Sequence, residues 1–420
     1  MIAVVREFRS FGWPSRLLMI NQFGINLGFF MLMPYLAGYL AGPLGLAAWA
    51  VGLVLGVRNF SQQGMFIVGG TLADRLGYKP LIVAGCLLRT AGFGLLVVAQ
   101  SLPMVLIASA ATGFAGALFN PAVRAYLAAD SGERRVEAFA LFNVFYQAGI
   151  LAGPLVGLAF MAVDFRLTAA IAAAVFAALT IAQLFALPQR DVESGDGGTS
   201  ILQDWRTVLA NRSFLLFAVA MIGSYVLSFQ VYLALPLHAA SLSPEHESIL
   251  IAAIFVVSGA VAVAAQVRIT RWFSARWGSD RSLVIGMMVV ALAFLPLVVV
   301  PDARFGVAAG IGALLICTAI LAIGSAAVFP FEMDTVVALS GGRLVGTHYG
   351  FYSTIIGIGI LVGNVATGSL VQIARDRDLP GLVWVVLVGI GVLCAAALRA
   401  LARNGHLQDG AIRPKVSATQ

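Results

Sequence analysis

The ionisable side chains in or beside long apolar runs are the residues of this sequence that could bind and release protons or bind charged ligands. Four of them, Asp74, Glu332, Asp334 and His348, carry a carboxyl or an imidazole that can bind and release a proton. Such a group can couple proton movement to another process when its pKa changes as a cavity opens and closes. These four residues are the candidate proton carriers. A solvated helix end is the alternative explanation for Glu332 and Asp334.

Two arginines also lie within apolar runs, where a charge is expensive and is usually functional or paired. Arg58 stands in a polar patch with Asn59, Gln62 and Gln63. Contact with a substrate, stabilisation of a nearby carboxylate and organisation of a hydrogen-bonded cluster all remain open for it. For Arg89 the favoured explanation is snorkelling or pairing with a neighbouring helix.

The composition indicates the class of protein in which these ionisable groups lie. Hydrophobic residues make up 60% of the 420 residues and charged residues only 11%, with a mean hydropathy of +0.95. A soluble protein has roughly a quarter of its residues charged, so the chain is an integral membrane protein. Its net charge of +7 comes from short basic clusters between apolar runs. Such clusters indicate topology signals and lipid contacts rather than nucleic-acid binding.

Twelve apolar runs are long enough to cross a bilayer, since a spanning helix needs about 20 residues. They comprise 17–40, 47–70, 80–100, 103–127, 136–161, 166–188, 213–238, 248–272, 282–301, 305–331, 344–373 and 380–402. The sequence therefore predicts an all-α membrane protein with twelve transmembrane helices in two pseudo-symmetric six-helix bundles. The bundles occupy 1–188 and 213–402, with a linker in 189–212 and a tail in 403–420. The linker contains DVESGDGG and then ILQDWRTVLANR, which is expected to form a short amphipathic helix.

Basic residues set the expected orientation. With the N-terminus inside, the outer loops hold only Arg166, Arg304, Arg375 and Arg377, and most of the 26 basic residues fall in the inner loops and tails. Positive charge is retained in cytoplasmic loops, so both termini and the linker are predicted to be cytoplasmic. We expect no cleavable signal, because the run after Arg16 is too long for a signal-peptide core.

The two halves resemble each other when one is shifted by 210 residues. The shift places Gly132, Phe142, Gly149 and Gly153 over Gly342, Tyr352, Gly359 and Gly363. It also places Arg124 over Asp334, which predicts a salt bridge between them at the inner gate. Two repeated halves imply a solute site between them near the membrane midplane, reached alternately from either side.

The stretch GTLADRLGYKP joins the second and third runs and is expected to form a loop. It closely resembles the loop signature of the major facilitator superfamily, with matches at Gly70, Leu72, Ala73, Asp74, Arg75, Gly77 and Lys79. The resemblance implies a cytoplasmic gate that latches the outward-facing state. Asp74 then needs donors from the N-terminal end of another helix or from an arginine. An ordinary charged turn is the alternative. The second-half counterpart, SARWGSDR, has Ala275 in place of the aspartate, so the latch is expected on one side only.

A second stretch, GILAGPLVG in the fifth run, resembles the motif of proton-linked exporters in this superfamily. The matches are Gly149, Gly153, Pro154 and Gly157. The resemblance implies a helix face packed tightly against the eighth helix, since small residues four apart permit close approach. A generic glycine packing face is the alternative. Exporters of this group often carry an arginine four residues before a glycine in the fourth helix, but here Ser109 precedes Gly113, so that proton relay is missing.

Aromatic and amide residues on five faces are candidates for the substrate cavity. They are Asn26, Phe30, Asn143, Tyr146, Gln147, Tyr225, Phe229, Gln230, Tyr232 and Tyr352. Such a mixture suits bulky amphiphilic molecules held by burial and stacking. Aromatic residues at these spacings are also common in helix packing, so each assignment has a structural alternative.

These features predict a proton-driven exporter of hydrophobic or amphiphilic drug-like compounds in a bacterial cytoplasmic membrane. A second interpretation is an exporter of one metabolite, such as a sugar, a siderophore or a lipid. A third is a receptor or lipid scramblase that needs no proton gradient. The expected partners are a small-molecule substrate, protons and lipids, and we expect a monomer without metal or cofactor. An ATP-driven pump or an enzyme is disfavoured, because the only lysines, Lys79 and Lys415, lie outside any glycine-rich phosphate loop and no nucleophile elbow occurs.

Overall fold

The computed structural model describes residues 2–41, 43–46, 48–161, 164–189, 200–301 and 306–407 of the chain. Helices account for nearly all of these residues, and this described part contains no strand. The polar stretch DVESGDGG of the linker, Arg304 and residues 408–420 of the predicted tail lie outside the described residues.

The first half contains eight helices and one 3-10 turn. They are α1 (Ile2–Ser10), α2 (Trp13–Ala41), α3 (Ala48–Gln63), α4 (Phe66–Leu76), α5 (Tyr78–Val98), α6 (Leu102–Ser131), η1 (Gly132–Arg134), α7 (Arg135–Met161) and α8 (Phe165–Ala186). The helix α9 (Ile201–Ala210) follows, in the stretch where the sequence predicts a short helix.

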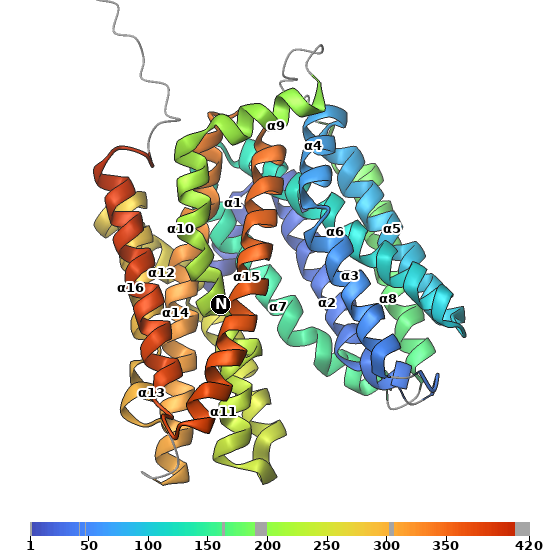
Figure 1. Cartoon of the computed structure of the whole chain (residues 1–420). Coiled ribbons are helices and arrows are strands. Elements are labelled where there is room, and N and C mark those ends of the chain that lie inside the picture. Colours follow the sequence, from blue (N-terminus) through green and yellow to red (C-terminus); the bar gives the residue numbers. More distant parts are fainter. Residues whose placement is uncertain are drawn as a thin grey trace, which may run out of the picture.

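The second half contains the remaining elements. They are α10 (Arg212–Ser228), η2 (Phe229–Tyr232), α11 (Ala234–Leu242), η3 (Pro244–His246), α12 (Glu247–Leu292), α13 (Leu295–Val299), α14 (Val307–Ser340), α15 (Val345–Asp376) and α16 (Leu382–Arg403). Figure 1 shows the two halves as separate bundles that meet where α9 crosses between them and diverge toward the opposite end. We call these two ends the α9 end and the open end.

The twelve predicted crossings can be traced in the described chain. Nine helical stretches among the described residues are long and apolar enough to cross a bilayer. Two of them, Leu102–Gly157 and Ile249–Val299, are 56 and 51 residues long and each contain two crossings. They turn at Gly132 and at Gly278, whose positive φ angles favour glycine. The polar pair α3 and α4, divided by a turn at residues 64–65, completes the twelve.

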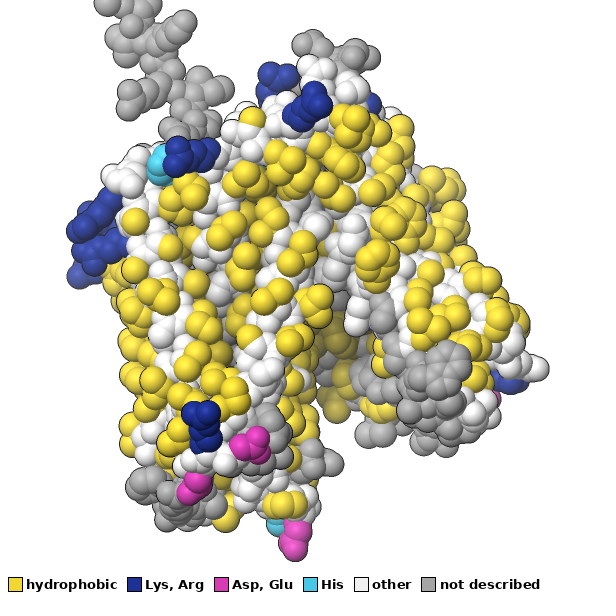
Figure 2. Space-filling view, viewed as in Figure 1, with side chains coloured by type: hydrophobic (Ala, Val, Ile, Leu, Met, Phe, Trp, Pro, Cys, Tyr) yellow, Lys and Arg dark blue, Asp and Glu magenta, His cyan; other side chains and the backbone are white. Residues whose placement is uncertain are grey.

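The outer surface of the bundles is apolar, as contact with lipid requires. Phe185, Leu393 and Val299 are 80%, 71% and 68% exposed, although each is a large hydrophobic residue. Figure 2 shows hydrophobic side chains over both bundles and a hollow between them at the open end. A water-exposed surface of this kind would aggregate, so the composition and the surface agree on an integral membrane protein.

Two seams join the halves. In the first seam, α4 packs against α15, and a side chain at Gly346 would stand 2.8 Å from the Gly70 carbonyl oxygen. In the second seam, α7 packs against α12 and α14, where Leu151 fills the space beside Gly259. The absence of side chains at Gly70 and Gly346 lets the two backbones of the first seam touch.

Two expectations about element boundaries were wrong, and one further helix was not predicted. GTLADRLGYKP is not a loop, because α4 continues to Leu76 and Gly77 alone, at φ +90°, links it to α5. The tenth crossing does not end after Pro330; α14 continues to Ser340 and places Glu332 in its interior. The N-terminal segment, which the sequence left without structure, forms α1.

The glycine face of GILAGPLVG packs differently from the expectation. Side chains at Gly149 and Gly153 would stand 2.6 Å from the Phe23 carbonyl oxygen and 2.7 Å from the Phe30 Cβ, both on α2. The glycines therefore contact the first crossing of their own half, whereas Leu151 of the same stretch packs beside Gly259 of the eighth crossing. The repeat keeps this arrangement, because Gly359 and Gly363 of α15 pack against α10 in the same way.

Replacement of Gly157 by alanine tests this contact. Its Cβ would overlap the carbonyl oxygen of Met31 on α2, and overpacking of this kind typically destabilises by about 1–3 kcal/mol. We expect Gly157→Ala to lower the midpoint of thermal unfolding in detergent, followed by circular dichroism. Gly94→Ala is the matched control, because nothing lies within 4 Å of its Cβ. Equal midpoints for the two variants would contradict the packing.

Candidate functional site

The first seam is held by a carboxylate at a helix N-terminus. Asp74, at the end of α4, accepts hydrogen bonds from the backbone N–H groups of Gly346 and Thr347 at 2.9 and 2.6 Å and from the Thr347 hydroxyl at 2.7 Å. These donors lie in the first turn of α15, in the other half of the molecule. A helix N-terminus has unpaired N–H groups and a partial positive charge, so it binds a carboxylate well. Asp74 thus caps a helix of the second half.

The surroundings of Asp74 keep this contact ionic. The side chain is only 6% exposed. All three of its hydrogen-bond donors come from Gly346 and Thr347. Hydrogen bonds from such donors to a carboxylate are of the stronger, charge-assisted kind.

The helix α9 makes further contacts beside the first seam. Arg75 donates to the Asp204 carboxylate at 2.6 and 3.0 Å. Trp205 donates from Nε1 to the Thr71 hydroxyl at 2.8 Å and packs edge-on against Phe351 of α15. The linker helix therefore contacts both halves beside Asp74. Gly77 provides the turn that follows, and Lys79 stands half-buried in the first turn of α5.

The second seam contains a different set of polar contacts. Arg135 of α7 pairs with Asp334 of α14 at 2.8 Å. The predicted bridge between Arg124 and Asp334 is therefore wrong; Arg124 instead makes a long contact of 3.4 Å with Ser353 on α15. The 210-residue shift correctly related the two positions but could not reveal that each one faces a different neighbour across the seam.

A buried amide pair lies deeper in the second seam. Asn143 of α7 donates to the Gln266 side chain of α12 at 2.8 Å, and Gln266 donates to the Ala326 carbonyl of α14 at 2.6 Å. Gln266 is fully buried. These bonds tie the halves together, so Asn143 serves the seam here rather than an open cavity.

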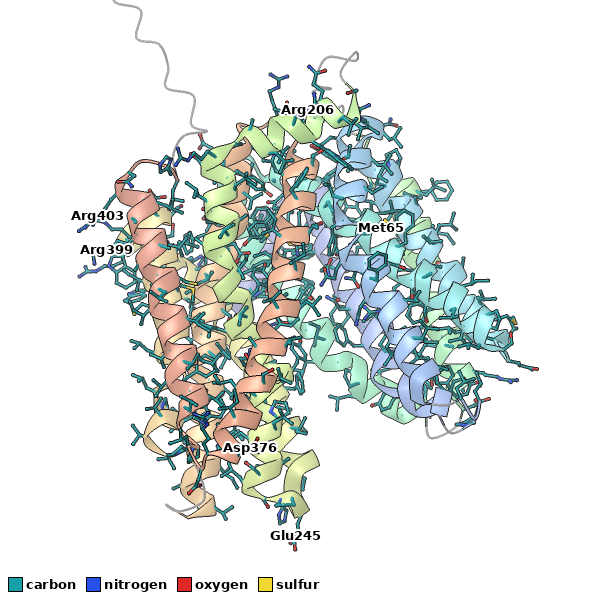
Figure 3. The ribbon with its side chains drawn as sticks, viewed as in Figure 1. Met65, Arg206, Glu245, Asp376, Arg399 and Arg403 are labelled. Carbon is teal, nitrogen blue, oxygen red and sulfur yellow. The ribbon has the colours of Figure 1, made fainter. Side chains whose placement is uncertain are left out.

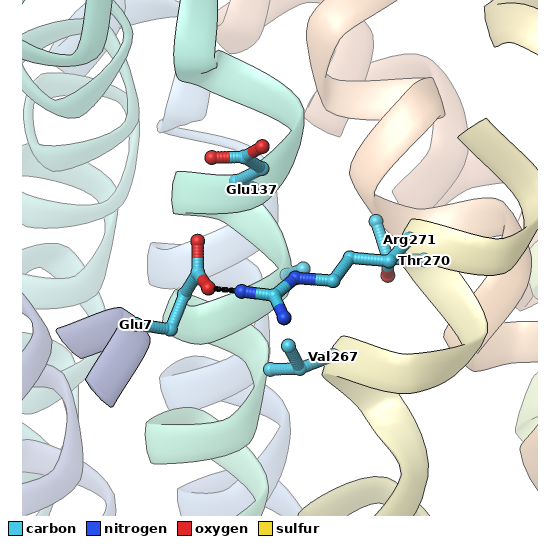
Figure 4. A pocket seen from close by; sticks show the side chains of 6 residues that line it. Glu7, Glu137, Val267, Thr270 and Arg271 are labelled. Carbon is cyan, nitrogen blue, oxygen red and sulfur yellow. Dashed lines mark ion pairs between the residues drawn. The ribbon is translucent and has the colours of Figure 1, made fainter. Parts of the chain in front are cut away.

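An acid that the sequence analysis missed completes the second seam. Glu7 of α1 forms ion pairs with Arg134 of the first half, at 3.0 Å, and with Arg271 of the second half. Figure 4 shows Glu7 facing Arg271 across a small pocket that Glu137, Val267 and Thr270 also line. Glu7 is 6% exposed although it lies near the chain start. Only the three-dimensional path of α1 brings it to this place.

Glu332 lies at the centre of the second half. Its Oε1 accepts hydrogen bonds from the hydroxyls of Tyr225 and Tyr352 at 2.7 and 2.6 Å, and the residue is 2% exposed. Both partners are neutral, whereas the carboxylate of Asp334 is paired with a guanidinium. Glu332 therefore has surroundings that can accommodate either protonation state, whereas the contact with Arg135 favours the charged form of Asp334.

His348 has a packing environment. Its Nδ1 lies 2.8 Å from the Leu344 carbonyl, so that nitrogen carries the proton, and the ring packs edge-on against Phe214. It is 4% exposed, and its Nε2 has no hydrogen-bond partner. The histidine is thus bound to its own helix turn rather than to another candidate proton carrier.

The two arginines of the first half lie close to the same aromatic ring. The guanidinium carbons of Arg58 and Arg89 stand 4.4 and 5.8 Å from the centroid of Phe29. Arg58 donates to the amide oxygens of Asn59 and Gln62 at 2.8 and 2.9 Å. Arg89 is 5% exposed and does not snorkel to a membrane surface; of the two alternatives predicted for it, contact with neighbouring helices agrees with its position near Phe29 and Phe119.

The predicted cavity residues divide into two groups. Those used in packing or in buried hydrogen bonds are Asn26, Phe30, Asn143, Gln230 and Tyr352. Those that remain partly or fully exposed are Tyr146, Gln147, Tyr225, Phe229 and Tyr232. The second group includes the Phe229–Tyr232 ring pair of η2, where the seventh crossing is interrupted.

Comparison with known proteins identifies the architecture. The sequence profile of the Major Facilitator Superfamily matches residues 18–309, more than half of the chain. The chain belongs to the major facilitator superfamily. As a member of this superfamily it is a membrane transporter and not an enzyme.

Relatives and a solved structure agree with the superfamily assignment. An uncharacterized MFS-type transporter of Mycobacterium tuberculosis strain H37Rv is 66% identical over 395 residues, covering 94% of each chain. Multidrug resistance protein MdtH of Salmonella arizonae is 28% identical over 395 residues, again covering 94% of each. The crystal structure of the human organic anion transporter MFSD10 shares the fold, with a TM-score of 0.71 at 16% identity over 92% of this chain and 98% of that one.

Hydrogen exchange tests the Asp74 contact directly. Asp74→Ala leaves the Gly346 and Thr347 N–H groups without their acceptor, and a charge-assisted hydrogen bond contributes about 1.5–3 kcal/mol. We expect exchange in a peptide covering 345–352 to become about tenfold faster or more, measured by mass spectrometry. Asp164→Ala is the control, because Asp164 caps α8 within one half through the Arg166 N–H at 2.9 Å. Unchanged exchange at 345–352 in Asp74→Ala would refute the capping contact.

A double-mutant cycle tests the ion pair between the halves at Glu7. Glu7→Gln and Arg271→Gln remove the same contact, so we expect the double variant to lose less thermal stability than the sum of the two single losses. Glu133→Gln is the matched control, since Glu133 is an exposed glutamate of η1. Additive losses for Glu7 and Arg271 would show that the pair contributes nothing.

Proposed function

We propose that this transporter exports hydrophobic or amphiphilic drug-like compounds in exchange for protons, by alternating access, with Glu332 as the proton carrier. The observation that supports the proposal most is the environment of Glu332, a carboxyl in the core whose hydrogen-bond partners are two neutral tyrosines. A group that carries protons must be stable both with and without its proton. Paired groups such as Asp334 meet this condition less well.

The distribution of charge supports an orientation with the α9 end in the cytoplasm. Figure 3 labels Arg206, Arg399 and Arg403 at the α9 end and Glu245 and Asp376 at the open end. Under the positive-inside rule the α9 end then faces the cytoplasm. In this orientation the seams close the cytoplasmic side and the hollow of Figure 2 opens outward, which is the state in which an exporter releases its substrate.

A cycle of two states follows from this arrangement. Outside protons reach Glu332 through the hollow, and protonation removes the charge that its tyrosines hold. The Asp74 and Glu7 contacts then release, the cytoplasmic side opens, Glu332 releases its proton to the cytoplasm, and the substrate enters between the two halves. The relationship to MdtH, a multidrug resistance protein, supports drug-like compounds as substrates. An exporter of one specific metabolite on the same fold is the alternative.

Proton flux in liposomes tests the proposal. With an internal pH dye and an imposed proton gradient, we expect members of a panel of lipophilic cations, anions and neutral drugs to cause proton movement in the native protein. Glu332→Gln should abolish this flux, because the amide cannot release a proton, while exchange of substrate without a gradient persists.

Two comparisons complete this experiment. Glu133→Gln, a change at an exposed glutamate, should behave as the native protein, and Asp334→Asn should reduce flux and exchange together because it breaks a seam contact. Retention of coupled flux in Glu332→Gln would overturn the role of this residue. The absence of flux with every compound would favour the specific-metabolite alternative.

A further inference from the structure

We propose that Arg58 and Arg89 form a site for the negatively charged group of the substrate, so that the compounds exported are amphiphilic organic anions. This inference deepens the proposed function and rests on it for the direction of transport, but not for the binding itself. It specifies the charge of the substrate, which the proposed function leaves open.

The first observation is an imbalance of charge in the core. Arg58, Arg89 and Arg124 lie within the crossings of the first half, whereas the buried carboxyl of Glu332 in the second half bonds to two tyrosines. Asp334 is already paired with Arg135. Among the described residues, no carboxylate forms an ion pair or hydrogen bond with Arg58 or Arg89. Charges buried in this way are costly unless a partner of opposite charge joins them.

The second observation is that the neighbours of Arg58 and Arg89 are neutral groups instead of carboxylates. Arg58 donates to two side-chain amides, and the Nε atoms of both Arg58 and Arg89 are buried without a hydrogen-bond partner. Arg89 is surrounded by the rings of Phe29, Phe119 and Phe176, each 5.8 or 5.9 Å from its guanidinium carbon. Amides and aromatic faces solvate a cation but leave its charge in place. Both arginines therefore keep donors for an incoming anion.

The third observation is the position of the pair beside the hollow. A side chain at Gly357 of the second half would stand 3.4 Å from the Cβ of Gln63, at the end of α3, so the two halves lie close together at this point. Arg58 lies on the open-end side of that contact, as α3 runs toward the α9 end (Figure 1). Arg58 also donates to Gln62 at 2.9 Å, and Gln62 is the direct neighbour of Gln63 in the chain. The arginines thus belong to the region between the two halves.

These features define the ligand class. A guanidinium binds a carboxylate or similar oxyanion through paired N–H donors, and the neighbouring ring of Phe29 offers a face for an apolar or aromatic body. An amphiphilic cation would meet repulsion from the two guanidinium groups. A neutral compound would bury the apolar part but leave the arginines unpaired.

Matched probes test the proposal on purified protein in detergent, without a proton gradient. The probes are 2-naphthoate, 2-naphthamide and 2-naphthylmethylammonium, which share one ring system and differ in charge. Binding is measured by equilibrium dialysis at low and equal ionic strength. We expect the native protein to bind 2-naphthoate at least tenfold more tightly than either of the other probes. A preference for the cation, or no preference, would overturn the proposal without the use of any variant.

Substitutions assign the preference to the two arginines. Arg58→Gln and Arg89→Gln should each weaken 2-naphthoate binding at least tenfold and change 2-naphthamide binding less than twofold. Arg166→Gln, the same change at an exposed arginine of α8, should alter neither. Equal losses for all three probes, with an unchanged unfolding midpoint, would assign the arginines a structural role and overturn the proposal. Because no proton movement is involved, failure of proton coupling leaves this result intact.

Discussion

The structure depends on the contact between the Asp74 carboxylate and the N-terminus of α15. The contact joins the two halves at one end, where the backbones of Gly70 and Gly346 touch and no side chain intervenes. It is ionic, directional and buried, and it exists only while the two helices are in register. A contact of this kind is strong when formed and is lost completely after a small displacement, which suits a joint between two alternative arrangements.

Both seams join the two halves of the molecule, but they use different residues. The first uses a carboxylate on a helix N-terminus and is supported by α9 through Arg75 and Asp204. The second has Ala275 in the equivalent place of the loop signature, and its carboxylates come from Asp334 and, through α1, from Glu7. The repeat is thus preserved in the helix packing, where α7 meets α2 as α15 meets α10, and is broken in the polar contacts. An N-terminal helix outside the twelve crossings has become part of the closed end.

Local patterns in the sequence predict the crossings and the kind of partner that Asp74 needs, but not which helices contact one another. Hydropathy and length located the crossings, and the position of Asp74 at a membrane edge made a partner from a helix N-terminus a reasonable expectation. Spacing alone could not decide which neighbour Gly149 and Gly153 face, because every helix in a bundle has several neighbours. The partner of Asp334 and the position of Glu7 depend on tertiary contacts between segments more than a hundred residues apart. Pro330 was taken as the end of a helix, but the neighbouring helices let α14 continue past it.

The central claim is that the halves alternate about the Asp74 contact, and distances between spin labels test it most directly. Cysteines for labelling replace Leu76 and Arg281 at the α9 end, and Val98 and Leu379 at the open end, in a protein whose Cys86, Cys317 and Cys394 are changed to serine. Double electron–electron resonance then reports one distance at each end. We expect Asp74→Ala to lengthen the distance at the α9 end and to shorten the distance at the open end. Unchanged distances, or lengthening at both ends together, would contradict it.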